Sequence, residues 1–160
     1  MTPTLQVEIK QKRPFGSLGE EVYLNLLRTA DALLRQVELA LKPAGLSSTQ
    51  YNVLRILRGA APGGLACCEI GDRMITRDPD ITRLLDRLEA RGLVKRERER
   101  SDRRVVKTRI TAEGLRILKT LDEPIAALHR RQLRQADPRR LRLLIRLLEQ
   151  AREERPQAEE

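Results

Sequence analysis

Aromatic side chains are nearly missing from this chain of 160 residues. Trp is absent, and the aromatic residues are Phe15, Tyr23 and Tyr51. Proteins that bind single-stranded nucleic acid stack successive bases on aromatic rings, so three scattered rings argue against that kind of binding platform.

Residue types that bind metals or form disulfides are also scarce. The two cysteines, Cys67 and Cys68, are adjacent, which argues against the disulfide framework of a secreted protein. His129 is the only histidine. A zinc site needs several Cys, His or acidic ligands together, and an activated nucleophile needs a base beside it. No phosphate-binding glycine loop occurs either, and we therefore predict no metal, no cofactor and no enzymatic activity.

Long hydrophobic runs do not occur. No stretch of 18 residues is free of charge, and no apolar core follows Met1. A transmembrane helix needs about 20 predominantly apolar residues, and a secretory signal needs an apolar core. We therefore predict a soluble, cytoplasmic protein that consists of one domain with added helices and has no membrane partner.

Charge of both signs is abundant, with an excess of positive charge. The chain holds 32 Lys and Arg and 23 Asp and Glu, a formal net charge of +9. The excess falls in two blocks: residues 77–109 hold twelve basic and seven acidic residues, and residues 130–146 hold seven basic and one acidic. Such an excess favours a polyanionic partner, although a basic stretch is also typical of a solvated face.

Apolar residues spaced three and four apart predict long amphipathic helices toward both ends of the chain. The first spans about residues 17–41 and ends before Pro43 and Gly45. Two more begin after Thr111 and Asp137, residue types that cap helices. The last helix is expected to bury a stripe that consists of Leu141, Leu144, Ile145 and Leu148.

Shorter elements are predicted between these helices. Ser47 and Gln50 form a capping-box candidate for a helix through about residue 58, and a loop over 59–64 separates it from a short helix over about 67–74.

A third short helix is predicted from Asp78 to just before Gly92. Asp78 is suited to cap it and Pro79 to occupy its first position, and Gly92 is suited to end it. Asp80 is interpreted as a partner of the helix dipole or, alternatively, as an acceptor for cytosine.

Two runs with strand character follow, over residues 93–100 and 105–110, and the basic segment 101–104 between them predicts a β-hairpin. Three short helices followed by such a hairpin form a winged helix-turn-helix, in which the third helix enters the major groove of DNA and the hairpin reaches the backbone or minor groove. The predicted fold is therefore mainly α: a winged helix-turn-helix with a two-stranded β-hairpin wing, flanked by N- and C-terminal dimerisation helices.

The residues of this region resemble the MarR (multiple antibiotic resistance regulator) family of transcription factors. The matching runs are LSSTQYNVL at 46–54, ITRLLDRLEARGLVKR at 81–96, SDRR at 101–104 and ITAEG at 110–114. The resemblance covers about residues 17–150. It implies a homodimer that binds a palindromic operator, often represses transcription, and releases DNA when a small, often phenolic, molecule binds.

The resemblance and the helix pattern divide the chain into parts. We expect a flexible N-terminal arm (1–16), a helical dimerisation region (17–45 and 112–152), a DNA-binding domain (46–111) and an acidic tail (153–160). The apolar stripes of the first and last helices favour dimerisation independently, because they would otherwise expose apolar patches that monomers avoid. The alternative is that these helices pack only within one chain.

Candidate DNA contacts follow from the recognition helix and the wing. Thr82, Arg83 and Arg87 fall on the outward face of the predicted helix, and Arg77 lies just ahead of it. Arg83 is suited to bidentate pairing with guanine; the alternative is a solvated surface arginine.

In the wing, the family pattern is acidic-x-Arg-Asp-Arg-Arg, whereas this chain reads ERSDRR at 99–104. Asp102, Arg103 and Arg104 match, and Asp102 is expected to orient an arginine through a charge-assisted bond. Ser101 replaces the usual arginine, so Arg100 is our substitute for the residue that enters the minor groove.

Three residues are candidates for an effector pocket that binds a phenolic or other aromatic molecule. Tyr23 and Tyr51 lie on helices that line this pocket in the family, and His129 is the third candidate; the alternatives are core packing for the tyrosines and a structural or solvent-facing role for His129. The predicted function is a sequence-specific, double-stranded-DNA-binding transcriptional regulator, a ligand-responsive repressor acting as a homodimer on a pseudo-palindromic operator. The alternatives are a winged-helix protein-interaction module and a thiol redox-sensing regulator that uses Cys67 and Cys68.

Overall fold

A computed structural model describes residues 4–60, 62–76, 80–99, 104–134 and 136–153 of the chain. The predicted effector residues and the apolar stripe predicted for the last helix all lie within these ranges, whereas four predicted DNA contacts lie outside them. The elements, in chain order, are α1 (Leu5–Glu8), α2 (Leu18–Leu41), the 3-10 turn η1 (Lys42–Ala44), α3 (Ser48–Gly59), β1 (Leu65–Ala66), α4 (Cys67–Arg73), α5 (Ile81–Ala90), β2 (Val94–Arg98), β3 (Val106–Ile110), α6 (Ala112–Gln132) and α7 (Pro138–Gln150).

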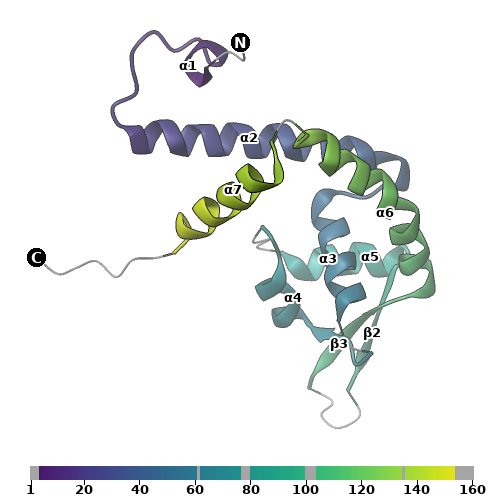
Figure 1. Cartoon of the computed structure of the whole chain (residues 1–160). Coiled ribbons are helices and arrows are strands. Elements are labelled where there is room, and N and C mark those ends of the chain that lie inside the picture. The colour runs from purple at the N-terminus through teal and green to yellow at the C-terminus, as the bar shows by residue number, and fades with distance from the viewer. Residues whose placement is uncertain (1–3, 61, 77–79, 100–103, 135, 154–160) are drawn as a thin grey trace, which may run out of the picture.

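The mainly helical winged helix-turn-helix predicted from the sequence is confirmed. α3, α4 and α5 pack beside a small sheet. The long helices α2 and α6 extend away from this unit, and α7 follows α6 (Figure 1). The predicted hairpin is present as β2 and β3, which pair antiparallel with Val94 opposite Ile110 and Arg98 opposite Val106. The sheet has a third strand that we did not predict, because β1 contains only two residues and is too short to show an alternating pattern.

The predicted helix starts are confirmed at four places. Ser17, Ser47, Thr111 and Asp137 each accept a hydrogen bond from a backbone N–H of the first turn that follows, and Ser47 and Gln50 form the expected capping box. These caps satisfy amides that have no partner within the helix.

The predicted start of the third short helix was wrong. α5 begins at Ile81 and its cap is Asp80, whose Oδ1 accepts from the Arg83 N–H at 3.2 Å. Asp78 and Pro79 lie outside the described residues. Two aspartates with the same capping chemistry stand two positions apart, and the one three residues before Arg83 forms the bond, as cap geometry requires.

The hydrophobic core joins the winged unit to the two long helices. It contains residues of α3, α4 and α5, the end of α2, and Leu118, Leu121 and Ile125 of α6. The expected burial of the last helix is absent within the single chain, where the Leu144 and Ile145 side chains remain 44% and 54% exposed. The reason is that α7 meets α2 across an open groove, described below.

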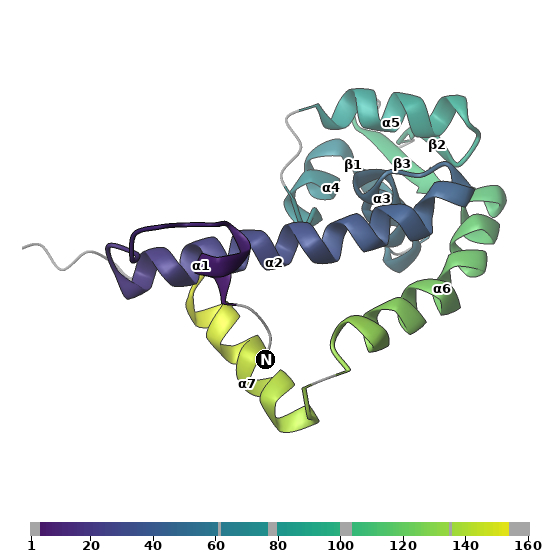
Figure 2. The same ribbon diagram turned by 90° about the horizontal axis from the view of Figure 1, so that it is seen from above.

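α7 turns back toward the N-terminal half of α2, far from α5 and the sheet (Figure 2). α1 lies against α2 as well: Leu5 is buried, and Arg28 Nε of α2 is 3.6 Å from Glu8 Oε2. The described part of the predicted N-terminal arm therefore contacts the first long helix. Among the described helices, none combines the length and the apolar character needed to cross a bilayer.

Candidate nucleic-acid interface

α5 separates an apolar face from a polar one. Leu84, Leu85 and Leu88 are buried in the core, whereas Thr82, Arg83 and Arg87 are exposed on the opposite side. The three predicted contacts of the recognition helix therefore share one solvent-facing surface. The major groove of B-DNA is wide enough to admit an α-helix such as α5.

Asp80 organises the start of this surface. Besides capping α5, it pairs with the guanidinium of Arg83, with 3.1 Å between Arg83 Nε and Asp80 Oδ2. The Arg83 side chain is still 78% exposed. Since ion pairs at such exposure contribute little, the pair leaves Arg83 able to exchange its partner for a base edge or a phosphate.

A hollow of about 370 Å³ lies beside Arg83 and Arg87, between α5 and the start of α3. Its lining includes Ser47, Thr49 and Gln50 from α3 and Asp80 from the cap of α5. The two arginines outnumber the one carboxylate of this lining, Asp80, so the hollow carries an excess of positive charge. The capping box marked Ser47 as a helix start, but nothing in the sequence placed it next to α5.

The wing is only partly described. Arg104 is exposed at the start of the returning strand, whereas the predicted contacts Arg77, Arg100, Asp102 and Arg103 lie outside the described residues. Along the strands, basic side chains pair with acidic ones: Lys95 Nζ with Glu97 Oε1 at 2.8 Å and Lys107 Nζ with Glu99 Oε1 at 3.0 Å. Pairing of this kind offsets part of the excess charge of residues 77–109.

Arg96 of β2 binds two carboxylates of α5 and so joins the recognition helix to the wing. Its Nη2 lies 2.5 Å from Asp86 Oδ1, its Nε donates to Glu89 Oε2 at 2.8 Å, and its backbone N–H donates to Glu89 Oε1 at 2.9 Å. The side-chain bond from Arg96 lowers the pKa of Glu89, and the bond to Glu89 raises the pKa of Arg96. We did not predict this network from the sequence, because charge spacing does not show which strand residue faces a helix.

A second, apolar hollow lies far from α5, between α2 and α7. This groove has a volume of about 840 Å³ and is lined from α2 by residues such as Leu18, Val22 and Leu26, and from α7 by Leu144 and Ile145. The same five side chains are exposed, so the groove presents a continuous apolar surface to solvent.

Comparison with known proteins identifies the family. A sequence model of the MarR family matches residues 46–106. The crystal structure of a MarR transcription factor from Planctomyces limnophilus is 46% identical, covers 85% of this chain and 98% of that chain, and superposes with a TM-score of 0.65. The regulator PrsX of Escherichia coli is 31% identical over 113 residues, which are 70% of this chain and 68% of PrsX. This chain belongs to the MarR family.

As a member of the MarR family, the chain is a DNA-binding transcriptional regulator and not an enzyme. Another similar structure is that of CouR from Rhodococcus jostii RHA1, which is 29% identical, covers 84% of this chain and 93% of that chain, and has a TM-score of 0.72. That protein was solved bound to p-coumaroyl-CoA.

The three predicted effector residues of this MarR-family chain lie on three different helices. Tyr23 of α2 is 60% exposed, Tyr51 of α3 is buried in the core, and His129 of α6 is exposed. His129 Nδ1 is 3.1 Å from Gln132 Oε1, and Gln132 Nε2 donates to the Leu33 carbonyl of α2 at 3.0 Å. None of the three lines the hollow at α5 or the groove between α2 and α7. The core alternative is confirmed for Tyr51, and a shared effector site stays a prediction.

The two thiols differ in their surroundings. Cys67 is half-buried against the core at the start of α4, and Cys68 is exposed. A redox role for the two thiols stays a prediction. In the described ranges, no group of three or more His, Cys, Asp or Glu side chains is placed to hold a metal ion.

Proposed function

We propose that this protein is a ligand-responsive repressor that binds a pseudo-palindromic operator as a homodimer. The observation that carries the proposal is the surface of α5, which exposes Thr82, Arg83 and Arg87 to solvent beside a hollow that Arg83 and Arg87 help to line. In this proposal α5 reads base edges in the major groove, and the wing contacts the backbone or minor groove through Arg104 and the neighbouring predicted contacts. Since its target is DNA, we expect it to act in the cytoplasm.

The division of the chain follows the same proposal. Residues 46–111 serve as the DNA-binding domain, and residues 17–45 and 112–152 serve as the dimerisation region, with 1–16 as an arm and 153–160 as an acidic tail. The exposed apolar groove between α2 and α7 supports this division, because a second copy of the chain would cover a surface that a monomer would leave in water.

The proposed effector is an aromatic small molecule. CouR, bound to p-coumaroyl-CoA, is the similar protein that supports this choice. If the effector is of this class, p-coumaroyl-CoA should release the protein from its operator in a gel-shift assay. If the protein stays bound to its operator at saturating p-coumaroyl-CoA, that result would argue against an effector of this aromatic class.

Selection of bound sequences from random double-stranded DNA tests the central proposal. We expect enrichment of two inverted half-sites whose centres lie about 34–36 Å apart, one helical turn. Placing this operator over a promoter should lower transcription in vitro when the protein is added. A protein that enriches no sequence would favour the alternative of a protein-interaction module, and enrichment of one unrepeated site would argue against the homodimer.

A further inference from the structure

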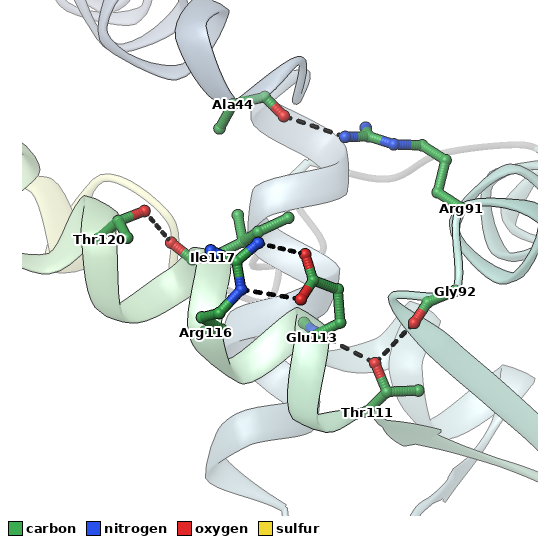
Figure 3. A network of polar contacts seen from close by, with 9 residues as sticks. Ala44, Arg91, Gly92, Thr111, Glu113, Arg116, Ile117 and Thr120 are labelled. Atoms are coloured by element: carbon green, nitrogen blue, oxygen red, sulfur yellow. Dashed lines mark hydrogen bonds and ion pairs between the residues drawn. The ribbon is translucent and has the colours of Figure 1, made fainter.

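The C-terminal end of α5 is bound to both long helices at one corner (Figure 3). Arg91, which ends α5, directs its guanidinium at the end of η1: Nη1 donates to the Gly45 carbonyl at 2.6 Å and Nη2 donates to the Ala44 carbonyl at 3.0 Å. On the other side of the corner, Thr111 Oγ1, at the start of α6, donates to the Gly92 carbonyl at 2.7 Å.

The α6 side of the corner is held by close backbone contact. The Thr111 N–H donates to the Leu93 carbonyl at 3.0 Å. Gly114 lies so near that carbonyl that a Cβ atom at this position would overlap it. α6 therefore has little freedom to move relative to the end of α5.

The α2 side is held by the Arg91 side chain. The carbonyls that it binds belong to Ala44, the last residue of the 3-10 turn that closes the 24-residue helix α2, and to Gly45, which has a left-handed φ of 62°. Carbonyls at the end of a helix lack partners within it and carry partial negative charge. A guanidinium suits this position because its planar fork binds two acceptors in a fixed orientation, whereas an ammonium acts as a point charge.

We propose that Arg91 is a positioning residue for operator recognition. By binding the end of α2, it fixes the angle between the recognition helix and the first dimerisation helix. In a homodimer, that angle sets the separation of the two α5 helices, and the separation selects the half-site spacing that binds best. The inference rests on the proposed function, and Arg91 itself contacts no base in it.

Operators that differ only in spacing test this inference. Starting from the selected operator, one base pair is inserted or removed between the half-sites, which shifts one half-site by about 3.4 Å and rotates it by roughly 35°. Wild-type protein should bind the altered operators at least about tenfold more weakly, because DNA or protein must deform to fit. Arg91→Ala should bind the optimal operator more weakly and show a severalfold smaller preference for it.

Two further variants sharpen the comparison. Arg116→Ala removes the same charge from the neighbouring start of α6, where Arg116 binds Glu113 of its own helix at 2.8 and 2.6 Å (Figure 3), and should keep the wild-type spacing preference. Arg91→Lys keeps the charge but cannot bind both carbonyls with a planar fork, so its preference should lie between those of wild type and Arg91→Ala. If Arg91→Ala does not fold, Arg91→Lys alone must show a reduced preference.

The two ways of failing are distinguishable. An unchanged spacing preference in the Arg91 variants would overturn the inference. This includes equal weakening of binding at every spacing, which a phosphate contact or general destabilisation would cause. A wild-type protein without any sequence-specific binding would overturn the proposed function and this inference together.

Discussion

Arg83 combines an exposed guanidinium with a place in the first turn of the recognition helix, so its role can be tested as a single residue. Arg83→Ala should cost about 1–3 kcal/mol in operator binding and relax discrimination at one base pair in each half-site. Titration of operators that carry single base changes, followed by fluorescence anisotropy, measures both effects. Arg35→Ala is the matched control, since Arg35 is an exposed arginine of α2 that pairs with Asp31. Weakening that is the same for every sequence would show that Arg83 contacts phosphate.

Glu89 gives a second residue-scale prediction, on stability. The bond from Arg96 holds the pKa of Glu89 below its usual 4.5, so the folded state favours the ionised carboxylate. The resulting stability is present above about pH 4.5 and is lost as the pH falls through the lower, folded-state pKa. Glu89→Gln should therefore be less stable than wild type at pH 7, and the difference should shrink toward pH 3. Urea unfolding across this range measures it; a difference that stays constant with pH would exclude the ion pair as its source.

At the scale of elements, the turn before β1 depends on Gly64. Its φ is 73°, and a Cβ atom there would lie 2.7 Å from the Thr108 carbonyl of β3. Gly64→Ala should thus destabilise the fold by about 1–3 kcal/mol, through left-handed strain and a displaced β1–β3 pairing. Gly63→Ala is the adjacent control, because a Cβ atom there would meet nothing within 4 Å. Thermal unfolding compares the two variants, and equal melting temperatures would contradict the prediction.

Elements with strong local signals could be predicted from the sequence. Caps and periodic leucines located α2, α3, α6 and α7, since both signals arise within a few residues of the chain. β1 could not be predicted, because its two residues are a strand only through their pairing with β3. The start of α5 was misplaced because the choice between two neighbouring aspartates depends on backbone geometry that local sequence does not encode.

The same distinction holds for the candidate site. The outward face of α5 follows from helical periodicity, which is why Thr82, Arg83 and Arg87 could be grouped in advance. Contacts between elements could not be predicted. The Arg96 network joins α5 to the strand that follows it, and the Arg91 corner joins α5 to a turn 46 residues earlier, and packing sets both relations. The family resemblance grouped the two tyrosines but could not give their burial: Tyr51 is buried in the core, and Tyr23 is exposed on α2.

At the scale of the whole molecule, the excess positive charge divides in space as well as in sequence. The basic block at 130–146 includes exposed Arg139, Arg142 and Arg146 on α7, far from α5 (Figure 2). Arg130 in that block binds Glu123 at 2.6 Å. In the proposed complex with the operator, the charges that meet DNA are those of α5 and the wing, and the net charge of +9 then overstates the electrostatic attraction available to the recognition surface.

The groove between α2 and α7 leads to the prediction for the assembly. Ile145 lines it and is 54% exposed in the single chain. If a second copy covers the groove, Ile145→Asp buries an unpaired carboxylate at the interface, which is strongly unfavourable. The variant should shift the protein from dimer to monomer in light scattering at micromolar concentration and should bind a single half-site more weakly than wild type binds the full operator.

Gln150→Glu is the control for this substitution, because it adds the same charge at an exposed position of the same helix. It should remain dimeric. A monomeric wild type, or an Ile145→Asp variant that stays dimeric and binds the full operator normally, would show that the dimer forms through another surface. In that case the apolar groove would need a different occupant, and the separation of the two recognition helices would no longer follow from the angle between α2 and α5.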